Sequence, residues 1–280
     1  MKRLIQYIIV AILAIVALAL ILINMLSSTI LNKEYILSKL QEQNYYDKIY
    51  EEAESNFENY IHQSGLDEEV LAGIVSKDKI EKDTKIIIDN IYDGKNEKID
   101  TEEIKNNLNE KIENSLNGKI SSSEQKSIDE FVNKICEEYE NTISHTNYEK
   151  KINSAMKRVK QYAGIMSKTL MIAIAILVFL LILLSFKEIY ALVARIGTAL
   201  VVDGLIFVLV EKYITSKIKI ETIVLLNKAI SDVLQNILNE ILNKISNYGS
   251  IMIITGTVLI VIYGIVKSKC SIRKEYTQED

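Results

Sequence analysis

Two ionisable residues interrupt an apolar stretch of the sequence, residues 192–210, which reads LVARIGTALVVDGLIFVLV. They are Arg195 and Asp203, and an ionised side chain inside a bilayer is costly enough to mark a functional site by default. Eight residues separate them. That is a rise of about 12 Å along an α-helix, so they do not pair directly within one helix. We therefore treat Arg195 and Asp203 as a candidate intramembrane polar site.

Each of these two residues also has a structural interpretation. Arg195 lies six residues into its apolar block, where a long side chain is expected to snorkel to the membrane surface. Asp203 is too short to do so, and an isolated charge near mid-bilayer costs at least about 2.5–3.5 kcal/mol. We expect Asp203 to be protonated or to hydrogen-bond another span. The candidate partners are Asn24, Thr255, Thr257 and Tyr263. A structural role and a role in proton or ion transport both stay open.

Two glycines lie in the same stretch. Gly197 and Gly204 are seven residues apart and share one helix face, so we predict that they allow another helix to pack closely there.

The cysteines and histidines predict no catalytic or metal site. Cys136 and Cys270 fall on opposite sides of the membrane in the four-span interpretation below, so they do not form a disulfide. His62 and His145 have polar surroundings and no second ligand at metal spacing. We expect both to be surface histidines.

The segment 93–103, DGKNEKIDTEE, invites a calcium interpretation because its end resembles that of an EF-hand loop. Aligning Glu103 with the bidentate position puts Tyr92 at the first ligand position and Glu97 where a glycine is required. An N-cap at Asp100 with a capping box closed by Glu103 explains the segment better. We therefore predict no metal ion and no cofactor.

Four apolar blocks position these residues: 4–26, 169–186, 190–210 and 249–266. Each has about the 20 residues that a helix needs to cross a bilayer, so we predict four transmembrane helices. The first block follows Lys2 and Arg3, as a cleavable signal peptide would, but its apolar run exceeds the usual 7–15 residues. We expect an uncleaved anchor.

Basic residues at the two chain ends favour cytoplasmic termini. Lys2 and Arg3 precede the first block, and a basic tail follows the fourth, as the positive-inside rule predicts. The opposing residues on the other side are Lys150, Lys151, Lys157, Arg158, Lys160, Lys168, Lys212, Lys217 and Lys219. Long translocated domains count weakly in that rule. The basic cluster from 150 to 168 also suits anionic lipid headgroups.

The region between the first two blocks predicts a helical bundle. Apolar residues recur at four-residue spacing from Tyr45 to Ile61, from Ile104 to Leu116 and through 128–143, and Ile80, Ile87 and Ile91 mark another helix. Residues 34–149 hold 13 lysines and 28 acidic residues, a formal charge of −15. This charge argues against nucleic acid as a partner and permits cations or basic proteins.

A second amphipathic segment links the third and fourth blocks. From Glu221 the apolar pattern predicts one helix of about 26 residues. Its charges over 219–248 balance, whereas helices that lie on membranes are usually rich in Lys and Arg. We favour docking on the helical bundle. The candidate docking face comprises Ile230, Leu234, Ile237 and Ile241.

The predicted fold class is all-α: a four-span helical membrane protein with an extracytoplasmic all-α bundle and a second amphipathic outer helix. The expected organisation is a transmembrane helix in 1–26, an extracytoplasmic acidic domain in 27–165, transmembrane helices in 166–186 and 189–210, an extracytoplasmic amphipathic helix in 211–248, a transmembrane helix in 249–267 and a cytoplasmic tail in 268–280.

Three hypotheses for function follow. The leading one is a non-enzymatic, multi-pass protein of the cell membrane whose outer domain binds or scaffolds another envelope component. The second is a transporter or channel subunit that works through Asp203. An enzyme comes third, because the sequence presents no recognisable nucleophile–base pair or phosphate loop. Membrane lipids and an envelope protein are the expected partners, and the oligomeric state is left open.

Overall fold

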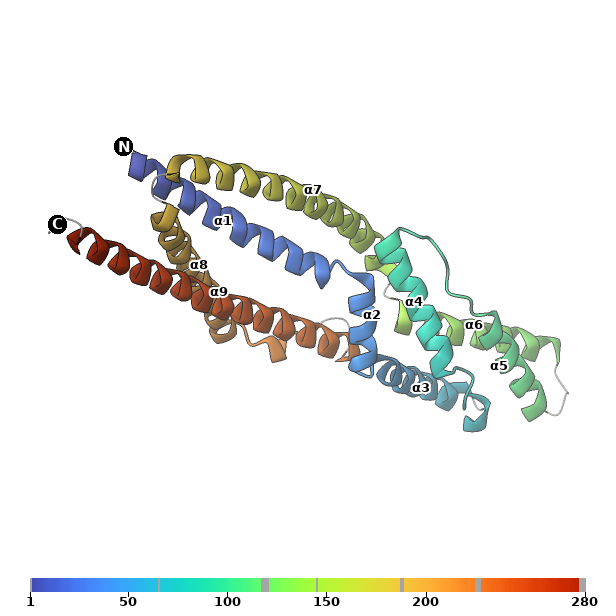
Figure 1. Cartoon of the computed structure of the whole chain (residues 1–280). Coiled ribbons are helices and arrows are strands. Elements are labelled where there is room, and N and C mark those ends of the chain that lie inside the picture. The colour runs from blue at the N-terminus through green and yellow to red at the C-terminus, as the bar shows by residue number, and fades with distance from the viewer. Residues whose placement is uncertain are drawn as a thin grey trace. The chain divides into compact units, whose positions relative to one another are not determined.

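The computed structural model describes residues 2–64, 66–116, 121–144, 146–186, 189–224 and 228–276, which form helices and no strand (Figure 1). The all-α fold class is therefore confirmed. The α-helices are α1 Lys2–Ser28, α2 Lys33–Glu42, α3 Tyr45–Ser64, α4 Lys77–Asp93, α5 Glu102–Ser115, α6 Ser122–Ile143, α7 Thr146–Ser185, α8 Ile189–Lys217 and α9 Lys228–Tyr276. Two 3-10 turns, η1 Glu68–Val70 and η2 Ile220–Thr222, complete the elements.

The chain divides into two compact units. One comprises Met1–Thr29, Gln161–Ile223 and Gln235–Asp280, and we call it the membrane unit. The other comprises Ile30–Lys160 and Val224–Leu234, and we call it the acidic unit.

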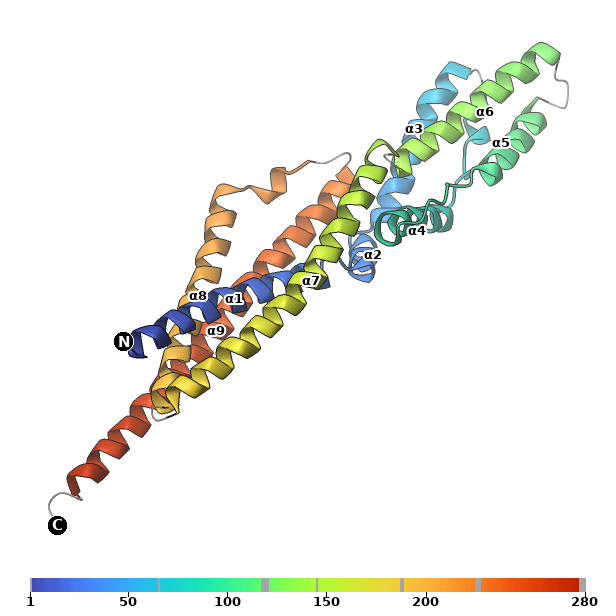
Figure 2. The ribbon, with the colours of Figure 1, turned by 90° about the horizontal axis from the view of Figure 1, so that it is seen from above.

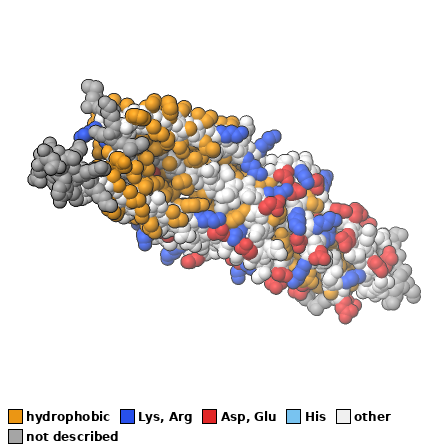
Figure 3. All heavy atoms as spheres, viewed as in Figure 1, with side chains coloured by type: hydrophobic (Ala, Val, Ile, Leu, Met, Phe, Trp, Pro, Cys, Tyr) orange, Lys and Arg blue, Asp and Glu red, His pale blue; other side chains and the backbone are white. Residues whose placement is uncertain are grey.

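Four helices are long and apolar enough to cross a membrane: Arg3–Ser28, Ile152–Ser185, Tyr190–Lys217 and Lys228–Ser268. Large apolar side chains on all four stay exposed, among them Ile15, Phe179, Leu209 and Ile254, which are 61–69% exposed. Figure 3 shows hydrophobic side chains gathered over the membrane unit and most of the charged ones over the acidic unit. Lipid, unlike water, accommodates such a surface without cost. The chain is therefore built as a membrane protein.

Polar contacts fix how α1 and α7 pair inside the membrane unit. The Gln6 amide donates to the carbonyl of Leu184 at 2.9 Å, and the Ser167 hydroxyl donates to Asn24 at 3.2 Å. The start of α1 thus lies beside the end of α7, and the end of α1 beside an earlier part of α7, so these helices are antiparallel. Gln6 and Asn24 are 18 residues apart. This is about 27 Å of helix, close to the thickness of a bilayer's hydrocarbon core.

Three one-sided helices form the core of the acidic unit. The stripes predicted on α3 and α6 are buried throughout, and on α5 the residues Ile104, Leu108 and Ile112 have no exposed surface. Leu116, the last residue of the α5 pattern, is instead 36% exposed. Burial of such a stripe is what stabilises a one-sided helix. The predicted core is confirmed for α3, α5 and α6, with the α5 stripe ending one turn early, whereas Ile87 and Ile91 of α4 are only partly buried.

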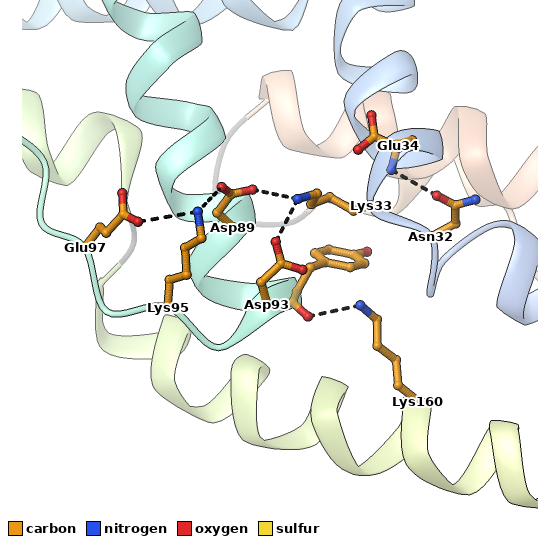
Figure 4. Close-up of polar contacts among 9 residues, drawn as sticks. Asn32, Lys33, Glu34, Asp89, Asp93, Lys95, Glu97 and Lys160 are labelled. Atoms are coloured by element: carbon orange, nitrogen blue, oxygen red, sulfur yellow. Dashed lines mark hydrogen bonds and ion pairs between the residues drawn. The ribbon is translucent and has the colours of Figure 1, made fainter.

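A polar corner joins the start of α2 to the end of α4 (Figure 4). Lys33 donates to Asp89 at 3.0 Å and to Asp93 at 2.7 Å, and Lys95 donates to Asp89 at 2.9 Å. Lys160 of α7 donates to the carbonyl of Tyr92 at 3.0 Å. The α4 helix can end here because Gly94 adopts the left-handed conformation, with φ of 71°.

Two sequence predictions about helix ends are wrong. The N-cap of α5 is Thr101 rather than Asp100, and no capping box forms there. The Asp100 carboxylate still accepts from the Glu102 amide at 3.0 Å, but its carbonyl is engaged by Lys79 at 2.6 Å. The contact from Lys79 holds the backbone carbonyl of Asp100. A complete capping box occurs instead at the start of α6, between Ser121 and Glu124.

The second amphipathic segment also differs from expectation. A helix was predicted from Glu221, but that residue lies in the η2 turn, and the helix begins at Lys228 and continues to Tyr276 without a break. The amphipathic helix and the fourth span are thus one 49-residue helix, α9. Gly249 does not end it, because no residue that forbids helix follows and the chain contains no proline.

Candidate functional site

Arg195 is buried at one end of the membrane unit and does not snorkel. Only 8% of it is exposed, and it donates to the Gln6 side-chain oxygen at 2.6 Å. Its guanidinium lies 5.1 Å from the centre of the Tyr7 ring. Gln6 also donates to the Ser185 hydroxyl at 3.1 Å, so this polar cluster joins α1, α7 and α8. The expectation of snorkelling is wrong because α1 supplies a hydrogen-bonding partner within the protein.

The two glycines of α8 lie against two glycines of α9. A Cβ atom added to Gly197 would lie 2.7 Å from the carbonyl oxygen of Gly256, and one added to Gly204 would lie 2.5 Å from that of Gly249. The glycines on α9 are also seven residues apart and pair in reverse order, so α8 and α9 cross antiparallel at both points (Figure 2). Backbones approach this closely only where side chains are absent.

Asp203 lies on the face of α8 that packs on α1. Leu192, with Ile196 and Ala199 beside it, packs against Val10 of α1. Asp203 follows Ala199 by four residues and Ile196 by seven, and residues at these spacings share a helix face. The side chain is buried, with 4% exposed.

No hydrogen bond or ion pair joins Asp203 to any other residue in the described parts of the chain. The candidate partners make other contacts: Asn24 accepts from Ser167, and the Thr257 hydroxyl donates to the carbonyl of Ile253 at 2.7 Å. Thr255 is exposed, and the ring of Tyr263 lies 5.8 Å from Lys267. The interhelical hydrogen bond considered for Asp203 is therefore not formed in this structure.

The candidate docking face on α9 is shared between the two units. Ile230 and Leu234 lie in the acidic unit, while Ile237 and Ile241 lie in the membrane unit. In the part of α9 that belongs to the acidic unit the buried residues are Ala229, Ser231 and Val233, and Asp232 pairs with Lys48 of α3 at 2.6 Å. Ile230 and Leu234 are only partly buried. Ile237 and Ile241 are buried, so the buried face of α9 differs from the predicted one only in the acidic unit, where it is rotated by one residue.

The acidic unit contains a buried polar cluster that the sequence patterns did not predict. Tyr139 of α6, with no exposed surface, donates its hydroxyl to Asp83 of α4 at 2.6 Å. Lys79, one turn before Asp83, pairs with the same carboxylate at 3.1 Å. Burial and the bond to Asp83 raise the pKa of the Tyr139 hydroxyl, which keeps it a neutral donor. The available signal was that Asp83 interrupts the apolar stripe between Ile80 and Ile87.

An open groove lies between the end of α3, the end of α5 and the first half of α6. Its volume is about 450 Å³, within the range of ligand-binding pockets. The apolar and aromatic lining residues are Tyr60, Leu66, Leu116, Ile128 and Phe131. The polar lining residues are Glu124, Ser127, Glu130 and Lys134. We refer to this feature as the α3–α5–α6 groove.

Several local causes shape this groove. Leu116 remains exposed at the end of α5, and the capping box at Ser121 and Glu124 fixes where α6 begins. Tyr60 is held by a hydrogen bond from its hydroxyl to Glu138 at 3.0 Å. The lining thus mixes apolar and aromatic side chains with carboxylates, an arrangement suited to an apolar side chain that has a cationic neighbour.

Comparison of the chain with protein-family models, with curated proteins and with solved structures finds no match. We therefore infer the function from the geometry of the described residues.

Proposed function

We propose that this chain is a non-enzymatic, multi-pass protein of the cell membrane whose acidic unit lies outside the cytoplasm and binds another envelope protein. The observation that carries the proposal is the α3–α5–α6 groove. Its lining combines apolar and aromatic residues, Phe131 among them, with the acidic residues Glu124 and Glu130. Aromatic and apolar pockets of this kind are where binding energy concentrates in protein interfaces.

The charge of the acidic unit defines the partner further. Residues 34–149 carry a formal charge of −15, and the groove contributes two carboxylates against one lysine. Such a surface attracts cationic partners and repels acidic ones. The occupant is therefore a protein segment that presents apolar side chains flanked by Lys or Arg.

Site-specific crosslinking tests the groove. A photo-crosslinking amino acid in place of Ser127, which lines the groove, should capture one protein in intact cells. The same amino acid in place of Asn133, an exposed residue of α6 that does not line the groove, serves as the control. Equal capture at both positions, or none at Ser127, would falsify the groove as the binding site.

A pair of neighbouring charge reversals sharpens this test. Glu130→Lys puts a cation in the groove and should reduce crosslinking from position 127 by about tenfold, since like charges at an interface oppose binding. Asp129→Lys makes the same charge change next to it on α6 but outside the lining, and it should leave crosslinking within about twofold. If both variants lost crosslinking equally, the partner would be attracted by the overall charge and would not bind at a defined site.

Thiol labelling tests the location of the acidic unit. Asn96 is exposed, so Asn96→Cys should react with a membrane-impermeant thiol reagent in intact cells, while native Cys270 in the basic tail should not. Cys136 is buried, and burial raises its pKa, so it reacts slowly and reports unfolding. Labelling of Cys270 with position 96 protected would reverse the topology and remove the extracytoplasmic part of the proposal.

A further inference from the structure

Asp203 is buried, with 4% exposed, and the described residues offer it no hydrogen bond or ion pair. It follows Ile196 and Ala199, which pack against the α1 cluster, by seven and four residues, so it shares their helix face. Residues 8–23 of α1 read IIVAILAIVALALILI. Every one of them is aliphatic, so along this length α1 presents no side chain that can hydrogen-bond a carboxyl group.

The nearest formal charges of the membrane unit lie far along their helices. On α8 they are Arg195 and Glu211, eight residues before and after Asp203. The neighbouring apolar stretches of α7 and α9, residues 169–186 and 245–266, contain no charged residue. Arg195 is itself engaged by Gln6 at 2.6 Å. Among the described residues, no counter-ion is therefore placed to hold Asp203 in its ionised form.

We propose that Asp203 is a proton-binding site of the membrane unit, occupied while α1 and α8 are packed and emptied only when their contact opens to water. In the packed state the carboxyl group is neutral, because an unpaired carboxylate in an aliphatic setting is strongly disfavoured. To release the proton, its O–H bond breaks and the proton passes to a water molecule, which leaves a carboxylate that itself needs hydration. Proton release and separation of the two helices are thus one coupled event.

A proton fits this site better than a metal cation does. Hard cations such as Ca²⁺ and Mg²⁺ require about six oxygen ligands, whereas Asp203 offers two. Within the described residues, no group of three His, Cys, Asp or Glu side chains is placed to hold a metal ion. A single buried carboxyl can still exchange one proton.

Carbodiimide labelling of the whole protein in liposomes tests the site. The apolar reagent dicyclohexylcarbodiimide, which reacts with protonated carboxyls in apolar surroundings, should modify Asp203 and do so less as the pH rises. A water-soluble carbodiimide should modify the acidic unit and spare Asp203. Mass spectrometry locates the adduct. Asp203→Asn should lose it, and Glu211→Gln, the matched change eight residues along α8, should keep it.

Infrared difference spectra provide a second test that does not depend on reagent access. Wild type minus Asp203→Asn should contain the carbonyl stretch of a protonated carboxylic acid, and Glu211→Gln should leave that band in place. Modification of Asp203 by the water-soluble reagent, or a difference spectrum that shows only carboxylate bands, overturns the proposal.

Crosslinking α1 to α8 tests the coupling. Leu13 and Ala199 pack in the same apolar cluster, so Leu13→Cys with Ala199→Cys, in a background lacking Cys136 and Cys270, can be joined by a short bifunctional thiol reagent. In D₂O the carbonyl band should shift as the proton is replaced by deuterium, and the crosslink should slow this shift relative to the uncrosslinked double variant. Equal rates in the two states would show that proton exchange does not require α1 to move.

Discussion

The two units of this protein each bury an aspartate, but the two side chains differ in their polar partners. Asp83 in the acidic unit is 1% exposed and accepts from the Tyr139 hydroxyl at 2.6 Å, with Lys79 at 3.1 Å. Asp203 in the membrane unit is 4% exposed and has no partner in the described residues. A buried charge persists only when it is paired and hydrogen-bonded. The first carboxyl thus has a hydroxyl and an ammonium group as partners, whereas the second is the one that we propose to hold a proton.

The same contrast extends to how each unit is held together. The acidic unit packs apolar stripes and adds ion pairs at its surface, such as Lys33 with Asp89. The membrane unit leaves its large apolar side chains outside and brings α8 and α9 together through facing glycines. Helices in lipid gain little from burying apolar surface, because the lipid is equally apolar. Close packing of their backbones stabilises the helix pair instead.

The largest expected effect comes from breaking the paired aspartate. Asp83→Leu leaves the Lys79 ammonium buried without its carboxylate partner, with only the Asp100 carbonyl to accept from it, which should lower the free energy of unfolding by about 3–5 kcal/mol. Combining it with Lys79→Met and Tyr139→Phe removes the three polar side chains together and should recover most of that loss. Thermal and denaturant unfolding of the whole protein in detergent measures both.

The control for this comparison is Lys85→Met, which removes an exposed lysine of the same helix that pairs with Glu81 at 2.6 Å. It should cost less than about 1 kcal/mol. If the triple variant is as unstable as Asp83→Leu alone, the loss comes from repacking of the core and not from an unpaired charge.

A smaller effect is expected from the glycine contacts of the membrane unit. Gly204→Ala places a methyl group 2.5 Å from the carbonyl oxygen of Gly249, so α8 and α9 must move apart. Overpacking of this kind costs about 1–3 kcal/mol. Gly264→Ala is the matched control on α9, because nothing lies within 4 Å of the added atom.

Unfolding of both glycine variants in mixed detergent micelles provides the measurement. Equal stability of the two would mean that the close crossing of α8 and α9 is not maintained in solution.

Sequence patterns predicted the four long apolar helices and the buried stripes of α3, α5 and α6, since apolar block length and four-residue spacing are local properties. They also placed the glycines on a common face. They did not predict α2. Nor did they predict that Gln6 would meet Arg195, because the contact joins residues 189 positions apart on different helices. The start of α9 was misplaced for a similar reason. The apolar pattern continues from Glu221, but the backbone there forms the η2 turn, where the Gln235 amide donates to the carbonyl of Ile223 at 2.9 Å.

The α3–α5–α6 groove was also beyond sequence reasoning. Leu116 continues the apolar spacing of α5 and was assigned to the core, yet it is 36% exposed and lines the groove. Periodicity indicates which face a residue occupies, but it does not show where the neighbouring helices stop. The same limit applies to Asp83, because its partner Tyr139 becomes apparent only when α4 and α6 are placed together, although Lys79 lies one turn away on α4 itself.

The smallest effect is expected at Asp89, the exposed counterpart of Asp83 in the same unit. Hydrogen bonds from Lys95 and then Lys33 lower the pKa of this carboxyl. Because its folded pKa lies below its unfolded value of about 3.9, Asp89 stabilises the fold at neutral pH. This contribution is lost as the pH falls through the folded pKa. Its side chain is 26% exposed, so the contribution is screened and below about 1 kcal/mol.

We therefore expect Asp89→Asn to lower the free energy of unfolding slightly at pH 7, and the gap from wild type to close below about pH 4. Added salt should narrow the gap at pH 7, since salt screens exposed charges. Glu97→Gln, which removes the weaker contact of Lys95 at 3.5 Å, is the control and should have less effect. A gap that stays constant from neutral to acid pH would mean that Asp89 acts through its shape or packing, and the contrast between paired and unpaired aspartates would then depend on Asp83 and Asp203 alone.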